Sequence, residues 1–91
     1  MAGTRYIAPS ADEVRIVALD GLSVLYHAPS GMTHIVAAPA PEILEALQPG
    51  PADVPELMAR LCARYELEDE AHDIVALRLA ELEQAGLVRR A

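Results

Sequence analysis

Hydrophobic and polar positions alternate in short runs over the first part of the chain, a pattern typical of β-strands. Residues 14–27, VRIVALDGLSVLYH, contain two runs rich in β-branched side chains that are separated by Asp20-Gly21. This dipeptide tolerates the positive φ angles that a type I′ turn requires at both central positions. The pattern therefore predicts a β-hairpin closed by a two-residue type I′ turn.

A second turn and a third strand follow directly. Pro29 fixes φ at the first corner of residues 28–31, APSG, and Gly31 suits the exit from that turn. Residues 32–37, MTHIVA, then read as another strand. Three consecutive strands joined by short turns predict a three-stranded antiparallel meander.

The length of the second turn also predicts which side chains share a face of the sheet. A turn of four residues pairs His27 with Met32, and successive side chains along each strand then point to opposite faces. His27 and His34 fall together on one face, which we expect to be the outer one. We expect the core face to contain Val24, Tyr26, Thr33 and Ile35.

From residue 41 onward the apolar positions recur at steps of three and four, which is typical of helices. The first helix is predicted to begin near Pro41, because proline suits the first helical turn, and to stop at residues 48–51, QPGP. Its apolar stripe consists of Ile43, Leu44 and Leu47.

The second helix has the clearest signal. Asp53 and Glu56 form the D-x-x-E arrangement of an N-cap with a reciprocal acidic residue, so the helix is predicted to start here. The apolar residues that follow recur at helical spacing and predict one buried stripe. The members of that stripe are Val54, Leu57, Met58, Leu61, Cys62 and Tyr65.

A third helix is predicted over residues 70–85, with Gly86 as its stop. Arg78 falls inside its apolar stripe and allows two interpretations. Its stem packs while its head reaches solvent or pairs with Glu81, or it lies where a groove opens to receive an acidic group of a partner. The stripe itself comprises Ala71, Ile74, Val75, Leu82 and Ala85, with Leu79 at its margin.

These elements predict an α+β fold in which a three-stranded antiparallel meander is followed by a three-helix bundle. Residues 1–12 are expected to form a flexible arm that carries a short extended piece around residues 5–7, and residues 13–91 a single domain. Residues 87–90, LVRR, fit either a short final strand or a frayed tail.

Composition and charge exclude several classes of function. With no Trp, no Phe and 53% hydrophobic residues, the core must be aliphatic. Fourteen acidic residues against seven basic ones give a net charge of −7, which opposes a nucleic-acid backbone. The N-terminal residues lack the long apolar run of a signal peptide or a membrane span, so we expect a soluble cytoplasmic protein that does not bind membranes.

Candidate chemistry is sparse. His27, His34 and His72 supply too few ligands for a zinc site. Cys62 is assigned to a buried stripe, and as the single cysteine of the chain it cannot form an internal disulfide. The chain contains neither G-x-G-x-x-G nor the phosphate-binding G-x-x-x-x-G-K-S/T motif. The acidic run at residues 66–73, ELEDEAHD, fits a helix start stabilised by the macrodipole. We therefore expect no catalytic residue, no metal and no cofactor.

The third strand is the more informative feature, because in a meander it lies at the edge of the sheet. Its outer row of N–H and C=O groups has no partner within the predicted sheet. Residues 33–38, THIVAA, contain no lysine and no proline that would block pairing. Such an edge can accept an extended peptide as an additional strand.

Residues 22–47, LSVLYHAPSGMTHIVAAPAPEILEAL, followed by a capped helix and then LAELEQAGLV, resemble the PqqD family of small peptide chaperones. More narrowly, they resemble the branch called HPr-rel-A system PqqD family proteins. The resemblance covers residues 14–88, and its most specific part is the turn Y-H-x-P-S-G-x-T-H.

Such proteins are similar to the RiPP recognition element, a winged-helix-like module. The resemblance implies that the chain binds the leader of a ribosomally made precursor peptide and presents it to a modifying enzyme, which the narrower branch implies is HPr-kinase-like. It also implies that the leader adds to the third strand and packs against the third helix, where Arg78 replaces an expected apolar residue. The implied contacts are Met32, Thr33, His34, Ile35, Val36, Ala37, Val75, Arg78, Leu79 and Leu82.

Two other functions remain open at this point. A winged-helix DNA-binding regulator is compatible with the order of helices, but the third helix and its start carry many acidic residues, and Arg78 is the only cation placed to read bases. A homodimer formed by exchange of the hairpin or the arm is compatible with peptide binding. For the peptide-binding function we expect His34→Pro to remove a donor from the free edge.

Overall fold

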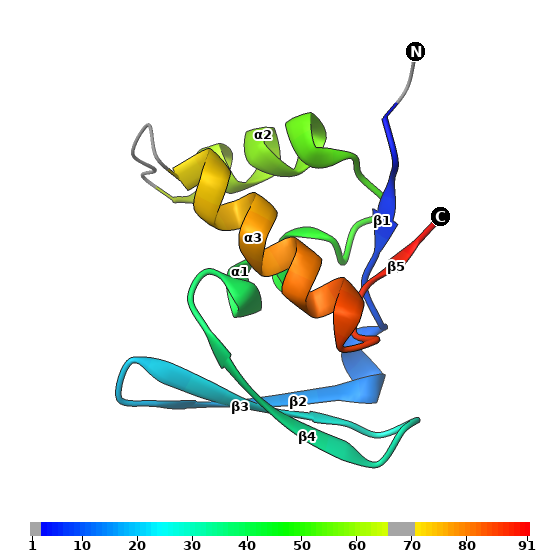
Figure 1. Ribbon diagram of the computed structural model, residues 1–91, viewed down its shortest axis with the longest axis vertical. Coiled ribbons are helices and arrows are strands. Elements are labelled where there is room, and N and C mark those ends of the chain that lie inside the picture. The colour runs from blue at the N-terminus through cyan, green and yellow to red at the C-terminus, as the bar shows by residue number, and fades with distance from the viewer. Residues whose placement is uncertain (1–2, 66–70) are drawn as a thin grey trace.

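The computed structural model describes residues 3–65 and 71–91 and has the predicted order of elements (Figure 1). Three β-strands precede three α-helices, and a very short strand lies near each end of the chain. In order, the elements are β1 (Tyr6–Ile7), the 3₁₀ helix η1 (Ala11–Glu13), β2 (Val14–Leu19), β3 (Leu22–His27), β4 (Met32–Ala37), α1 (Ala40–Ala46), α2 (Val54–Arg64), α3 (Ala71–Gln84) and β5 (Arg89–Arg90).

The predicted meander is confirmed: β2, β3 and β4 form an antiparallel sheet in that order. The two-residue turn at Asp20-Gly21 is also present, but the prediction of type I′ is wrong. Gly21 has φ +71°, whereas no described non-glycine residue has a positive φ. Glycine enters the positive-φ region without a steric cost. Asp20 therefore keeps a negative φ, and Gly21 is the one residue of this turn with a positive φ.

The predicted register between β3 and β4 is confirmed, with His27 opposite Met32 and Leu25 opposite His34. The predicted core face is wrong. Leu25 is fully buried, whereas Tyr26 is 44% exposed and Ile35 is 71% exposed. His27 and His34 share the side of Leu25 and are half-buried.

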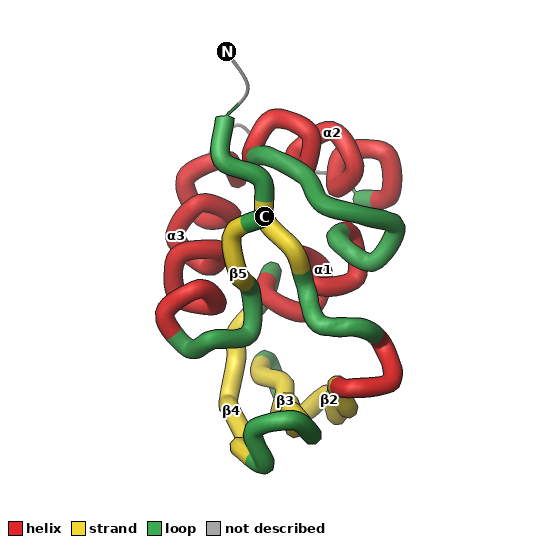
Figure 2. Tube along the Cα trace, turned by 90° about the vertical axis from the view of Figure 1, so that its right-hand side faces the viewer, coloured by secondary structure: helices red, strands yellow, loops and turns green. Residues whose placement is uncertain are grey.

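The reason for this inversion is visible in the arrangement of the layers. All three helices lie on one side of the sheet, and no helix or strand among the described residues covers its other side, which we call the bare face (Figures 1 and 2). Only two residues separate the end of β4 from the start of α1. This short connection keeps α1 close to β4, and α1 packs on the face of the sheet that contains Leu25. Because both faces carry apolar side chains, alternation alone does not distinguish the covered face from the bare one.

The first two helices begin as predicted. Pro41 occupies the first turn of α1. At the start of α2, Asp53 Oδ1 accepts a hydrogen bond from the Glu56 N–H (2.9 Å), and Glu56 Oε1 accepts one from the Asp53 N–H (3.2 Å). Leu57 and Leu61 of the predicted stripe are buried, but Cys62 is exposed. The stripe is narrower than predicted, because Cys62 lies about 100° around the helix from its neighbour.

In α3 the stripe is rotated from its predicted position. Leu79, assigned to the margin, is 2% exposed and lies in the core, whereas Ile74 is 46% exposed. Ala85 is also exposed. Gly86, with φ +80°, ends the helix as predicted. The predicted start at Glu70 and most of the acidic run at 66–73 lie outside the described residues.

The core lies between the helices and the covered face of the sheet. Every buried residue in it is aliphatic, as the composition predicts, and none is polar or charged among the described residues. No helix in the described ranges is long and apolar enough to cross a membrane. The buried residues are Leu25, Ala40, Ile43, Leu44, Ala46, Leu47, Ala52, Leu57, Leu61, Val75, Leu79, Leu82, Leu87 and Val88.

The two ends of the described chain lie side by side (Figure 2). The extended piece predicted around residues 5–7 is strand β1, which pairs antiparallel with β5, so the final strand predicted as one alternative is also present. Tyr6 further exchanges backbone hydrogen bonds with Ala52 (2.8 and 3.2 Å). In β5 the hydrogen bond from Arg90 to the Glu83 carboxylate (2.6 Å) raises the pKa of that guanidinium.

Candidate functional site

The outer edge of β4 presents backbone groups at alternate residues, and the register shows which ones. The Ala28 N–H donates to the Glu13 carbonyl (2.8 Å), one position beyond the pair formed by Val14 and His27. Hydrogen-bonded and non-bonded pairs alternate along an antiparallel ladder, so Ala28 and Tyr26 bond toward β2, whereas His27 and Leu25 do not. Leu25 therefore directs its backbone groups toward β4.

His34, the partner of Leu25, therefore bonds inward to β3. Thr33, Ile35 and Ala37 direct their N–H and C=O groups outward and form what we call the β4 edge. The expectation for His34→Pro is wrong, because the His34 N–H lies inside the β3–β4 ladder. Proline at Ile35 is the substitution that removes a donor from the β4 edge.

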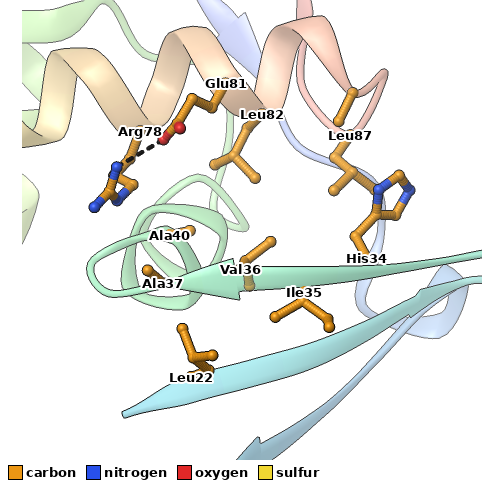
Figure 3. A pocket seen from close by; sticks show the side chains of 11 residues that line it. Leu22, His34, Ile35, Val36, Ala37, Ala40, Arg78, Glu81, Leu82 and Leu87 are labelled. Carbon is orange, nitrogen blue, oxygen red and sulfur yellow. Dashed lines mark hydrogen bonds and ion pairs between the residues drawn. The ribbon is translucent and has the colours of Figure 1, made fainter.

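A groove of about 270 Å³ runs beside β4, between that strand and α3 (Figure 3). Most of its lining is apolar, and its two polar side chains on α3 are Arg78 and Glu81. A strand placed against the β4 edge would direct every second side chain toward this groove. The lining residues are Leu22, His34, Ile35, Val36, Ala37, Ala40, Arg78, Glu81, Leu82, Ala85 and Leu87.

Six of the ten residues implied by the family resemblance line this groove: His34, Ile35, Val36, Ala37, Arg78 and Leu82. Met32 and Thr33 belong to the same strand but lie nearer its turn, outside the groove. Val75 and Leu79 do not line the groove and, at 1% and 2% exposed, belong to the core beneath the helix. The structure does not bring these two side chains to the binding surface.

Sequence reasoning missed five lining residues, and three of them carried a signal. Leu87 follows Gly86, whose left-handed conformation turns the chain back so that the Leu87 N–H donates to the Leu82 carbonyl (2.9 Å). Glu81 lies three residues after Arg78 on one helix face. Ala85 was predicted in the same helical stripe as Arg78 but not as a site residue, and Leu22 and Ala40 had no signal, because their place depends on packing between elements.

Arg78 is held at one end of the groove. Its Nε donates to the Ala38 carbonyl (3.2 Å), just after β4, and its Nη1 donates to Glu81 Oε1 (2.8 Å). The side chain is 27% exposed, so its stem packs while its head remains accessible to solvent. The predicted pairing with Glu81 is confirmed, and the guanidinium also ties α3 to the end of β4.

The histidines have local roles in the described structure. His27 Nδ1 lies 2.8 Å from Ser30 Oγ, and that hydroxyl also donates to the His27 carbonyl (3.3 Å), so the pair shapes the β3–β4 turn. His34 stands at the opposite end of the groove from Arg78 (Figure 3). Residues 3–65 and 71–91 contain no group of three metal-ligating side chains.

An antiparallel three-stranded sheet with three helices on one face defines an α+β, winged-helix-like fold class. The family model described as coenzyme PQQ synthesis protein D (PqqD) matches residues 23–88. The chain belongs to the PqqD family.

One solved structure has a similar fold: "TbiB1 in Complex with the TbiA(beta) Leader Peptide". TbiB1 is 22% identical in sequence, with a TM-score of 0.56, and the match covers 87% of this chain and 92% of that one. No curated protein matched the chain. The family resemblance and the predicted fold class are thus confirmed.

Proposed function

We propose that this protein binds the leader of a ribosomally synthesised precursor peptide by β-strand addition to the β4 edge and presents it to a modifying enzyme. The observation that carries the proposal is the open β4 edge beside an apolar groove. The similarly folded TbiB1 was solved with a leader peptide, which supports a peptide as the ligand.

The dimensions of the β4 edge suit a short extended segment. The outward groups of Thr33, Ile35 and Ala37 lie along about 13 Å of strand, at ~3.3 Å per residue. Main-chain hydrogen bonds along this length are independent of the peptide's sequence. Selectivity then comes from the side chains that point into the groove, where the half-buried Val36 offers apolar contact and the buried Leu82 and Leu87 line the groove from the core.

The role proposed for the protein is binding without catalysis, in the cytoplasm. The chemistry belongs to the partner enzyme, for which the narrower family resemblance implies an HPr-kinase-like protein. A homodimer remains compatible with this role, because the β4 edge of each copy can bind its own peptide. The DNA-binding alternative loses its main cation, since Arg78 is paired with Glu81 and lines the groove.

The test is a titration of ¹⁵N-labelled protein with the precursor peptide encoded beside it. We expect saturable shifts of the amide signals of residues 32–37 and of the α3 residues that line the groove. Shifts confined to β2 or to the bare face of the sheet would contradict strand addition at β4, and no shift with that peptide would contradict leader binding.

A pair of proline variants makes the test specific for the edge. Ile35→Pro removes an outward N–H from β4, whereas Ile16→Pro removes an outward N–H from β2, the opposite edge strand. Both residues are exposed isoleucines in strands of six residues, so the two changes are closely matched. We expect peptide binding to be lost in Ile35→Pro and kept in Ile16→Pro, provided that circular dichroism shows both to be folded.

A further inference from the structure

The two ends of the groove differ in chemistry (Figure 3). Near His34 the apolar side chains of the lining are the half-buried Val36 and, from the core, Leu87. Near the end of β4 the groove is bordered by the guanidinium of Arg78 and the carboxylate of Glu81. A peptide lying along β4 therefore meets an apolar contact at one end and a cation at the other.

We propose that Arg78 makes this protein selective for peptides that carry an acidic residue two positions from an apolar one. The proposal rests on strand addition at the β4 edge and names the class of peptide that the groove selects. Inward side chains of a strand recur every second residue, about 6.6 Å apart. The groove extends from His34 to Ala37 and so has room for two such side chains.

The hydrogen bonds of Arg78 prepare it for a carboxylate ligand. Bonds to the Ala38 carbonyl and to Glu81 hold Nε and Nη1 in place. In the described part of the chain, Nη2 has no hydrogen-bond partner. A guanidinium presents its donors as a planar fork that matches a carboxylate, and one already held in place loses less entropy when it binds.

Glu81 opposes this binding and gives the proposal a second, independent consequence. Its carboxylate neutralises Arg78 in the unbound protein, and its side chain is 55% exposed. An incoming peptide carboxylate must share the guanidinium with Glu81 or displace it, and the two carboxylates repel each other. Removing the charge of Glu81 should therefore strengthen the binding of acidic peptides, whereas removing Arg78 should weaken it.

The proposal can be tested without knowing the natural leader. A phage-displayed library of random peptides about twelve residues long, enough to cover β4 with flanking residues, is selected on the immobilised protein. We expect enrichment of peptides with an apolar and an acidic residue at positions i and i+2, in one fixed order. That order reports the direction in which the peptide runs along β4.

Three variants then test the assigned residues with one enriched peptide. Arg78→Met should weaken binding roughly tenfold, which is the usual size for a charge-assisted hydrogen bond. Glu81→Gln should strengthen it. Arg15→Met, which removes an exposed cation from β2, is the matched control and should leave the affinity unchanged. If Arg78→Met fails to fold, replacing the acidic peptide residue by its amide tests the same contact on the unaltered protein.

The outcomes separate this inference from the proposed function. If no enriched peptide loses binding to Ile35→Pro, strand addition at the β4 edge is wrong, and the inference fails with it. If enriched peptides depend on Ile35 but show no acidic preference, or bind Arg78→Met as tightly as the unaltered protein, the peptide-binding function stands and the selectivity assigned to Arg78 is overturned.

Discussion

The two edge strands of the sheet, β2 and β4, are alike in the backbone and differ in their surroundings. Both have six residues, and both pair with β3 and leave an outer row of backbone groups. β4 leads into α1 and has α3 across the groove. In contrast, β2 follows η1, has five exposed residues out of six, and borders a hollow of about 380 Å³ that residues of α1 also line.

The selectivity of an unpaired edge therefore depends on the chemistry of the side chains that a second element supplies beside it. Backbone groups alone offer the same hydrogen bonds to any extended chain. The groove beside β4 adds apolar contacts and the cation of Arg78. The edge of β2 borders a different hollow, between β2 and α1, whose one charged side chain among the described residues is the acidic Glu45. The Arg15 side chain of β2 does not line that hollow and is exposed.

The largest expected effect concerns Leu25, which anchors the strand between the two edges. Its side chain is fully buried against the helices. Leu25→Ala should lower the free energy of unfolding by about 2 to 5 kcal/mol, because it leaves a cavity in the core. Urea denaturation measures this change. A loss below about 0.5 kcal/mol would show that the sheet does not pack through Leu25.

The two hairpin turns provide a matched pair of the next size. Gly21, before β3, and Gly31, before β4, have φ +71° and +70°, and an added Cβ at either position meets nothing within 4 Å. Alanine at either position should therefore cost about 1 to 2 kcal/mol through backbone strain alone. Thermal denaturation of both variants measures the two losses of stability. Clearly unequal losses would show that the two turns do not depend on glycine to the same degree.

Hydrogen exchange distinguishes the edges directly. In the free protein the outward amides of Ile35 in β4 and Ile16 in β2 should exchange at comparable rates, because neither is paired within the sheet. With saturating peptide, the Ile35 amide should slow by at least about tenfold, as expected for a new hydrogen bond of ~1.4 kcal/mol. Slowing at Ile16 instead would reverse the assignment of the two edges.

The smallest effect is expected on the bare face of the sheet. Ile35 is 71% exposed, so Ile35→Thr keeps a β-branched side chain and should change the free energy of unfolding by less than about 0.5 kcal/mol. The same holds for Val17→Thr, since Val17 is 52% exposed. A loss of 2 kcal/mol or more at either position, on the scale of a core truncation, would mean that this face is covered in solution.

Local rules predicted much of this molecule correctly. The capping pair of Asp53 and Glu56, the stop at Gly86 and the pairing of His27 with Met32 depend on residues close together in the chain. The open edge followed from the order of strands. What failed was orientation: the covered face of the sheet, the centre of the α3 stripe and the exposure of Cys62.

The candidate site shows the same division. Its strand residues were predicted, because a meander leaves its last strand at the edge. The depth of Val75 and Leu79, and the presence of Leu87 in the groove, depend on how α3 lies against the sheet. The donors of the β4 edge required the complete register, which adds a hydrogen bond between Ala28 and Glu13 to the strand pairing.

The order of elements, their approximate boundaries and the pairing of neighbouring strands could be predicted from local patterns, because turn, cap and periodicity signals act over a few residues. The face of the sheet that the helices cover, and the way in which Arg78 and β4 border one groove, could be read only from the folded molecule. Those choices depend on packing among elements, and both faces of this sheet carry apolar side chains that satisfy the alternation equally well.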